Sequence, residues 1–275
     1  MVSPIVIYTD LDGALLDGKS YSWHAAEEAL EEIDRRRVPL VFCTSKTRAE
    51  VEDLRRKLGN THPFITENGG GVFIPHGYFS QPLDGAERAG HYHCFALGRS
   101  YMEIVDELDR IAAEAGAEVA GFHQMNAREI ASNTGLSPRQ VERARAREFD
   151  EPFFFAGADA AAEKRFLGIA RERGLQAVRG DRFWHLSAGS DKGRAVQLLS
   201  RFYRKNWRGR LQAVALGSSA NDLPMLAAVD LAVLLPELNG SFAPEVLARL
   251  PAIRRANAPG PAGWNEAVLR ILGGA

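Results

Sequence analysis

Short apolar runs alternate with amphipathic helical segments at both ends of this chain. Residues 5–9 and 38–43 are apolar enough to form buried strands, and the segment 23–37 between them repeats its apolar residues at helical spacing. The pattern resumes in the last third of the chain, where strands are expected at 211–216 and 231–235. Strands that alternate with helices form parallel sheets. The sequence therefore predicts an α/β fold whose two ends share one sheet.

Other segments near the two ends fit the same sheet. A strand at 64–66 is followed by a glycine-rich turn and by the apolar residues 72–74, which predicts a hairpin. Further helices are expected at 49–58, 192–204, 222–228 and 264–272.

The middle of the chain has a different order of predicted strands and helices. Strands are expected at 91–97, 153–156 and 183–188, and a helix at 101–115. Their order is not a regular βαβ repeat, which favours a mixed sheet with helices on one face. We therefore predict a core domain made of residues 1–86 and 189–275, interrupted by an inserted α+β domain at 87–188.

Charge and composition exclude several classes of protein. The formal net charge of −1 argues against a general nucleic-acid or membrane surface. No run reaches the roughly 20 apolar residues that span a bilayer. Cys43 and Cys94 are the only cysteines, so a disulfide framework or a cysteine-rich metal site is not expected. With no export signal ahead of the first strand, a cytoplasmic location is expected.

Two carboxylates follow the first strand directly. Asp10 and Asp12 are spaced i, i+2 and precede Gly13. In an extended segment such residues point to the same side, and ligands of open α/β sheets lie at this carboxyl edge. Two close carboxylates need a cation or a shared proton, and oxygen ligands suit Mg²⁺. One of them can then act as a nucleophile while the other moves protons. A simple turn at the strand end is the alternative.

Three further polar clusters stand where a phosphate site would need them. Thr44 and Ser45 follow the second strand and precede a helix N-terminus, which favours anions but also favours Ser and Thr as plain caps. Lys192 opens the helix that returns to the core, where it would offset phosphoryl charge or remain solvated. Asn221 and Asp222 follow a later strand and would either bind a hard cation or form a turn.

The order of these clusters resembles the haloacid dehalogenase-like (HAD) phosphatases, and the insertion resembles their type-B cap. Six further runs resemble the mannosyl-3-phosphoglycerate phosphatase family. They are Thr-Ser-Lys-Thr-Arg (44–48), Phe-Ile-Thr-Glu-Asn-Gly-Gly-Gly (64–71), Gly-Arg-Ser-Tyr (98–101), Gly-Phe-His-Gln-Met (121–125), Arg-Glu-Phe-Asp-Glu-Pro-Phe (147–153) and Gly-Pro-Ala-Gly-Trp-Asn (260–265). The resemblance covers both predicted domains and implies a Rossmann-like core with a cap that sets specificity.

The resemblance implies an Mg²⁺-dependent phosphatase. Its substrate would be the small molecule 2-O-mannosyl-3-phosphoglycerate, and its product mannosylglycerate, a compatible solute. Asp10 would form an aspartyl-phosphate, Asp12 would serve as acid and base, and Lys192 would stabilise the phosphoryl charge. Thr44, or Ser45 beside it, would bind the phosphoryl oxygens. Magnesium would lie on Asp10, Asp12, Asp222 and Asn221.

Two positions depart from the family pattern. Ala14 stands where a threonine is expected, and Ser218 stands where the first aspartate of Gly-Asp-x-x-Asn-Asp would bind the metal. The missing carboxylate predicts weakened Mg²⁺ affinity, with Asp222 or a water in its place. Two alternatives remain open: a phosphatase for glucosyl-3-phosphoglycerate or another sugar phosphate, and a catalytically impaired relative that only binds such ligands.

Specificity is expected to lie near the cap, because the core clusters recognise only the phosphoryl group. A salt bridge or a helix-end role is the plain alternative for each cap residue. The candidates are Lys46, Arg48, Glu67, Asn68, Gly69, His123, Gln124, Arg147 and Glu151.

Overall fold

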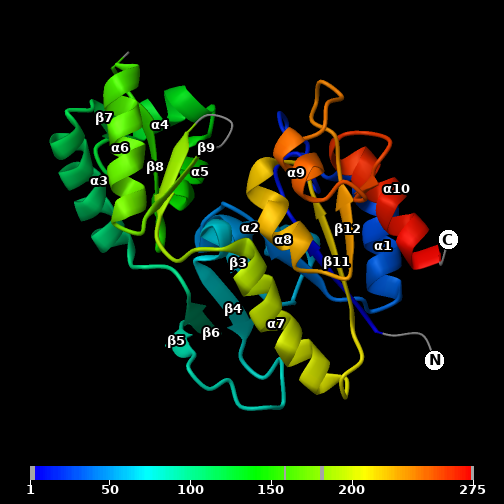
Figure 1. Ribbon diagram of the computed structural model, residues 1–275. Coiled ribbons are helices and arrows are strands. Elements are labelled where there is room, and N and C mark those ends of the chain that lie inside the picture. Colours follow the sequence, from blue (N-terminus) through cyan, green and yellow to red (C-terminus); the bar gives the residue numbers. More distant parts are fainter. Residues whose placement is uncertain (1–3, 158, 180–182, 274–275) are drawn as a thin grey trace.

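A nine-stranded sheet forms the centre of the larger part of the molecule (Figure 1). The structure, a computed structural model, describes residues 4–157, 159–179 and 183–273. The predicted domain ranges also include residues outside these limits. In spatial order the strands are β13 (Arg254–Arg255), β12 (Leu231–Leu234), β11 (Gln212–Gly217), β1 (Ile5–Thr9), β2 (Leu40–Cys43), β3 (Phe64–Thr66), β4 (Gly71–Pro75), β6 (Tyr92–Ala96) and β5 (Glu87–Ala89).

The two ends of the chain share this sheet, as the sequence predicts. β1 pairs in parallel with β11 on one side and β2 on the other, so strands more than 200 residues apart in the chain are neighbours. The carboxyl ends of β1, β2 and β11 therefore meet at one edge of the sheet. The predicted hairpin is also confirmed, because β3 and β4 pair antiparallel across the glycine turn that includes η2 (Glu67–Gly69).

Helices cover both faces of the large sheet. One apolar cluster packs alternate strand residues against α1, α2 and α10, and the other packs the intervening residues against α7, α8 and α9. The helices are α1 (Glu27–Arg35), preceded by η1 (His24–Ala26), α2 (Arg48–Leu58), α7 (Lys192–Asn206), α8 (Leu223–Ala227), preceded by η3 (Ala220–Asp222), α9 (Pro244–Arg249) and α10 (Gly260–Gly273). The last helix begins at Gly260, so Pro261 lies in its first turn, where proline is tolerated. The sequence pattern places that helix start too late.

The inserted unit has its own four-stranded sheet. The strand order is β7 (Val119–Gly121), β8 (Asp150–Phe155), β10 (Trp184–Ser187) and β9 (Gln176–Arg179), all antiparallel. Helices α3 (Tyr101–Ala115) and α6 (Ala160–Glu172) cover one face. Helices α4 (Ala127–Thr134) and α5 (Pro138–Arg145) pack with Phe154 and Phe183 on the other. The predictions of a mixed sheet and of helices on one face only are therefore wrong. Helices α4 and α5 have eight residues each, fewer than the window over which helical periodicity is recognised.

The edge of the insertion differs from the predicted residue 87. β5 and β6 pair with each other, and β6 pairs with β4, so residues 87–96 belong to the nine-stranded sheet. The chain then crosses to the smaller sheet. It runs there beside the segment by which it later returns to the core, and the Arg99 N–H donates to the carbonyl of Ala188 at 2.9 Å. Alternation alone identifies a strand but not its sheet. We therefore place the cap at about residues 97–188.

Two other sequence expectations concern membranes and thiols. No helix among residues 4–157, 159–179 and 183–273 is long and apolar enough to cross a membrane. Cys43 and Cys94 are buried free thiols.

Candidate active site

Asp10 lies at the carboxyl end of β1, in the middle of the large sheet. Its N–H donates to the carbonyl of Leu216 in the neighbouring strand. The Thr9 hydroxyl donates to the Asp10 carbonyl at 2.7 Å and accepts from the Trp264 indole N–H at 2.9 Å. Gly13 has φ +73°, the left-handed conformation that turns the loop after the carboxylates. Trp264, in the C-terminal run Gly-Pro-Ala-Gly-Trp-Asn, therefore holds the end of the strand that carries Asp10 by bonding Thr9.

Lys192 joins two carboxylates in the interior. Its Nζ lies 2.9 Å from Asp10 Oδ1 and 2.7 Å from Asp222 Oδ1, and all three side chains are buried. Burial raises the pKa of Asp10 to about 7, an effect that Asp222 reinforces and Lys192 opposes. Burial alone would lower the pKa of Lys192, but the two carboxylates outweigh it and raise that pKa, so the ammonium group stays charged. The sequence prediction that Lys192 lies beside Asp10 agrees with this geometry.

Asp12 lies on the more open side of Asp10. Its Oδ2 is 2.8 Å from Lys46 Nζ, whereas its Oδ1 is buried without a hydrogen-bond partner in the described part of the chain. Lys46 also lies 4.0 Å from Glu50 and 4.9 Å from the centre of the Tyr21 ring. Burial opposes its charge, but Asp12 and Glu50 raise the pKa of Lys46 overall. Asp12 therefore keeps one oxygen available for a proton or a ligand.

The loop after β11 wraps around Asp222. The Oδ2 atom of Asp222 accepts from the N–H groups of Ser218 at 2.9 Å and Ser219 at 3.1 Å, while Oδ1 accepts from Lys192. A Cβ on Gly217 would lie 2.6 Å from the Asp222 side chain, so this packing requires glycine. The Asn221 amide oxygen accepts from the Ser219 hydroxyl at 2.5 Å. Asp222 and Asn221, which the sequence predicts as metal ligands, therefore both accept hydrogen bonds within the protein.

Thr44 and Ser45 lie where β2 leads into α2. Thr44 is buried, and its hydroxyl oxygen accepts from the Lys46 N–H at 3.2 Å, which leaves the hydroxyl proton free to donate. Ser45 lines the cavity described next. Thr47, rather than either of them, caps α2 through a capping box with Glu50. The plain capping alternative is therefore wrong for Thr44 and Ser45.

A cavity of about 440 Å³ lies between the large sheet and the inserted unit. Its core wall includes Asp10, Asp12, Ser45, Lys46, Asn68 and Asn221, and its opposite wall includes Phe122, Arg147, Pro152, Arg179, Phe183 and His185. The volume is in the range of small-molecule sites. Carboxylates and cations on one wall face aromatic and basic groups on the other.

Glu67 joins the core to the inserted unit. Its carboxylate accepts from three consecutive N–H groups, those of Glu148, Phe149 and Asp150, at 2.8–3.1 Å. Its Oε2 lies 3.6 Å from the Arg147 guanidinium. Glu67 is fully buried. Glu67, which the sequence predicts as a substrate contact, therefore bonds the inserted unit to the core.

Arg147 and Arg48 also bridge the two units. Arg147 donates to the carbonyl of Ser45 at 3.0 Å, pairs closely with the Asp150 carboxylate and still lines the cavity. Arg48 lies 2.9 Å from Glu148, so its charge is already paired. Gly69, another candidate, packs against the backbone ahead of α7, since a Cβ there would lie 2.3 Å from the carbonyl carbon of Asp191. Among these three, only Arg147 faces the cavity.

Three cap candidates, His123, Gln124 and Glu151, make polar contacts within the inserted unit and do not line the cavity. His123 Nδ1 lies 2.7 Å from Glu151 Oε1, and Gln124 donates to Asp109 at 3.2 Å. Neighbouring residues of a strand point to opposite faces. In β8 this alternation points Glu151 away from the cavity, while Asp150 lies on the face of the sheet that carries His185.

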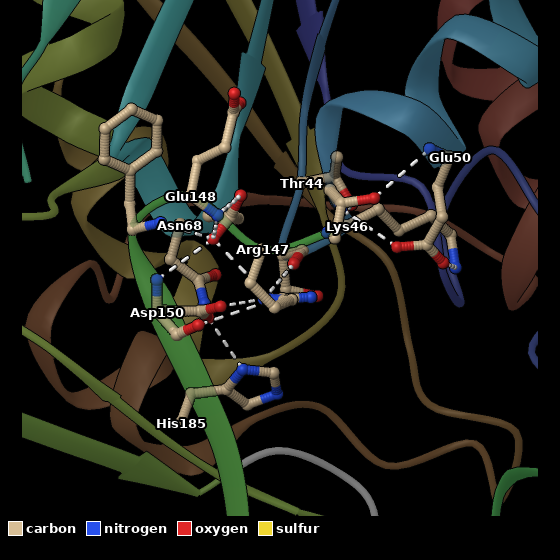
Figure 2. Close-up of polar contacts among 12 residues, drawn as sticks. Thr44, Lys46, Glu50, Asn68, Arg147, Glu148, Asp150 and His185 are labelled. Carbon is tan, nitrogen blue, oxygen red and sulfur yellow. Dashed lines mark hydrogen bonds and ion pairs between the residues drawn. The ribbon is translucent and has the colours of Figure 1, made fainter. Parts of the chain in front are cut away.

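Asp150 and His185 are not among the site residues predicted from the sequence. Asp150 Oδ2 lies 2.8 Å from His185 Nδ1, and His185 lines the cavity from β10 (Figure 2). The available signal was the alternation of polar residues with Trp184 and Leu186 in the predicted strand 183–188. Alternation shows that His185 and Trp184 lie on opposite faces of the strand, but it does not show which face meets the cavity.

The oxygen atoms around Asp10 fit Mg²⁺. Asp10 Oδ2 and the buried Asp12 Oδ1 have no hydrogen-bond partner among the described residues. The Ser218 hydroxyl lies 3.2 Å from the position of a Cβ on Gly13, so it stands against the same loop. Within those residues no group of three or more His, Cys, Asp and Glu side chains can hold a metal. Magnesium is often bound by one or two carboxylates with water and substrate phosphate, which these donors can provide.

Curated proteins similar to this chain are phosphatases. It is 39% identical over 98% of its length, and 97% of the relative's, to a glucosyl-3-phosphoglycerate/mannosyl-3-phosphoglycerate phosphatase of Methanococcoides burtonii. It is 41% identical, with the same coverage, to a protein of that name from Persephonella marina. A mannosyl-3-phosphoglycerate phosphatase of Pyrococcus horikoshii is 34% identical over 88% of this chain and 94% of its own.

Solved structures share the whole architecture. The HAD subclass IIB sugar phosphatase BT4131 superposes with a TM-score of 0.64 at 15% identity, covering 98% of this chain and 99% of that one. The sucrose-phosphatase of Synechocystis sp. PCC6803 superposes with a TM-score of 0.62 at 16% identity, covering 98% of each chain. Residues 7–84 match the family model for haloacid dehalogenase-like hydrolases. The chain thus belongs to the HAD-like hydrolases, in the family of glucosyl-/mannosyl-3-phosphoglycerate phosphatases.

Proposed function

We propose that this protein is an Mg²⁺-dependent phosphatase that removes phosphate from mannosyl-3-phosphoglycerate through an aspartyl-phosphate. The observation that carries this proposal is the buried Asp10 carboxylate, held by Lys192 and open to a cavity shared with the cap. Relatives named for both glucosyl and mannosyl substrates support glucosyl-3-phosphoglycerate as a second substrate.

In the proposed first step, one carboxylate oxygen of Asp10 attacks phosphorus while the bond from phosphorus to the glycerate oxygen breaks. Asp12 gives its proton to the departing alkoxide, for which its unpartnered oxygen is available. The Lys192 ammonium, with hydroxyls of Thr44 and Ser45, offsets the phosphoryl charge. Lys192 already contacts Asp10 Oδ1, so this charge is in place before the substrate binds.

In the second step, water attacks the phosphorus of the aspartyl-phosphate and Asp12 accepts its proton. The bond to Asp10 breaks, and the carboxylate and phosphate are released. Mg²⁺ would neutralise the charge shared by the phosphate and Asp10. That charge needs neutralising, because burial and Asp222 raise the pKa of Asp10 to about 7 in spite of Lys192.

For the metal we propose Asp10, the Asp12 carbonyl, and the Ser218 hydroxyl or a water beside it. Asp222 and Asn221 orient Lys192 and the loop, because their oxygens already accept hydrogen bonds. Asp222 therefore does not replace the carboxylate that is missing at position 218.

Replacing Ser218 by aspartate is expected to lower the Mg²⁺ concentration that gives half-maximal activity about tenfold or more. The new carboxylate would stand beside the Gly13 loop and add a charged ligand. Phosphate release measured across a magnesium titration checks this. Ser218→Asn is the matched control, since it adds similar volume without charge and is expected to leave the requirement high. An equal requirement in the wild type and Ser218→Asp would contradict the assignment.

A side-by-side assay tests the proposed function. Mannosyl- and glucosyl-3-phosphoglycerate are incubated with the protein at several magnesium concentrations and with EDTA. Phosphate release with kcat/KM above about 10⁴ M⁻¹ s⁻¹ for at least one substrate, abolished by EDTA, is expected. Binding of both compounds without release would instead identify an impaired relative. Hydrolysis of other sugar phosphates alone would assign a different substrate.

A further inference from the structure

A histidine on the cap wall faces the catalytic carboxylates across the cavity. In β10, Trp184 and Leu186 pack into the apolar cluster beneath α3 and α6, so His185 points to the opposite face. Its side chain is 19% exposed and lines the same cavity as Asp10 and Asp12. The phosphoryl group belongs at the core wall, so the cap wall meets the leaving group.

Asp150 orients this imidazole. Its Oδ2 lies 2.8 Å from His185 Nδ1, and its other oxygen pairs with the Arg147 guanidinium (Figure 2). A carboxylate beside Arg147 accepts hydrogen bonds, so Nδ1 carries the proton and donates it. Asp150 is itself fully buried and its N–H donates to Glu67, which fixes its position.

The remaining ring nitrogen is an acceptor. Burial, with the nearby Arg147, lowers the pKa of His185 to about 3, so the ring is neutral near pH 7. In a neutral ring whose Nδ1 is protonated, Nε2 has a lone pair and no proton. Nε2 has no hydrogen-bond partner among the described residues, unlike Nδ1.

The chemistry of this acceptor identifies the part of the substrate that it meets. A phosphate dianion and a glycerate carboxylate present acceptor oxygens, which a neutral acceptor nitrogen does not bind. The hydrogen-bond donors of a glycosyl-phosphoglycerate are the sugar hydroxyls. We propose, on the basis of the proposed function, that His185 determines specificity. Its Nε2 accepts a hydrogen bond from a hydroxyl of the glycosyl group. Asp150 is then a positioning residue that fixes the ring and its tautomer.

The chain contains a matched control. His123 also bonds a buried carboxylate through Nδ1, at 2.7 Å from Glu151, but it does not line the cavity. His123→Asn and His185→Asn therefore make the same chemical change in one domain. Asparagine keeps a short amide that can donate to the carboxylate, but it has no counterpart of Nε2.

The experiment compares substrate kinetics with inhibition by inorganic phosphate, which reports on the phosphoryl site alone. His185→Asn and His185→Ala are expected to raise the KM for the glycosyl-phosphoglycerate about tenfold, as for one lost hydrogen bond. Their kcat and the inhibition constant of phosphate are expected to stay within about twofold, and His123→Asn to match the wild type. Thermal unfolding of His185→Asn near the wild-type midpoint would show that the fold is intact.

Two results would overturn the role of His185: an unchanged KM in His185→Asn, or an inhibition constant for phosphate that rises in step with KM. Failure of the proposed function looks different, because the wild type itself would then release no phosphate from either glycosyl-phosphoglycerate.

Discussion

Replacing Asp10 by asparagine is expected to abolish phosphate release, with a loss on the order of 10⁴-fold or more in kcat. The amide is close in size to the carboxylate but is no nucleophile, and Lys192 and Asp12 cannot form the aspartyl-phosphate in its place. Phosphate release from the glycosyl-phosphoglycerate, measured at saturating magnesium, checks the expectation.

The fold is expected to tolerate this change. Burial and Asp222 raise the pKa of Asp10 to about 7 against the effect of Lys192, so the site already disfavours a charge at that position. Lys192 keeps its 2.7 Å contact with Asp222. The midpoint of thermal unfolding should therefore stay close to that of the wild type. Asp106→Asn, on the exposed side of α3, is the control for the same substitution at a distant position. Activity within tenfold of the wild type in Asp10→Asn would exclude Asp10 as the nucleophile.

Replacing Glu67 by alanine is expected to reduce the free energy of unfolding by about 3 to 5 kcal/mol. The change leaves the three N–H groups of residues 148–150 without their acceptor and takes one carboxylate from Arg147. Unsatisfied buried donors cost about 1 to 3 kcal/mol each when water does not replace the partner. Denaturation by urea measures the loss.

Two variants show whether the contact itself carries the effect. Glu67→Gln keeps one acceptor oxygen for the amides and is expected to lose less stability than Glu67→Ala. Glu142→Ala, on an exposed position of α5 in the cap, is expected to change stability by less than about 0.5 kcal/mol. A loss below about 1 kcal/mol for Glu67→Ala would show that the cap does not depend on this contact.

The core of the site could be predicted because its residues follow strands directly. Asp10 and Asp12 end β1, and the polar clusters at 44–45 and 217–222 end β2 and β11. In a parallel sheet these strand ends must meet, so the order of motifs along the chain already implied their proximity. Lys192 belongs to the same set because its helix packs across the sheet beside Asp10.

The cap residues could not be assigned in this way. The run Arg-Glu-Phe-Asp-Glu-Pro-Phe supplied Arg147 and Glu151 as candidates, yet the strand register points Asp150 to His185 and Glu151 to His123. A shift of one residue along a strand exchanges its two faces. Glu67 shows a second difficulty, because a charged residue next to a site looks the same in sequence whether it binds a ligand or another part of the chain.

Local periodicity and motifs at strand ends were enough to predict the α/β core, the insertion, the paired carboxylates Asp10 and Asp12 and the departure from the family pattern at Ser218. The three-dimensional fold was needed to show which sheet residues 87–96 join, which oxygens of Asp222 and Glu67 are already engaged, and that His185, held by Asp150, lines the cap wall of the cavity. Those features depend on pairing between distant segments and on which face of a strand is buried, and neither is encoded within a short window of sequence.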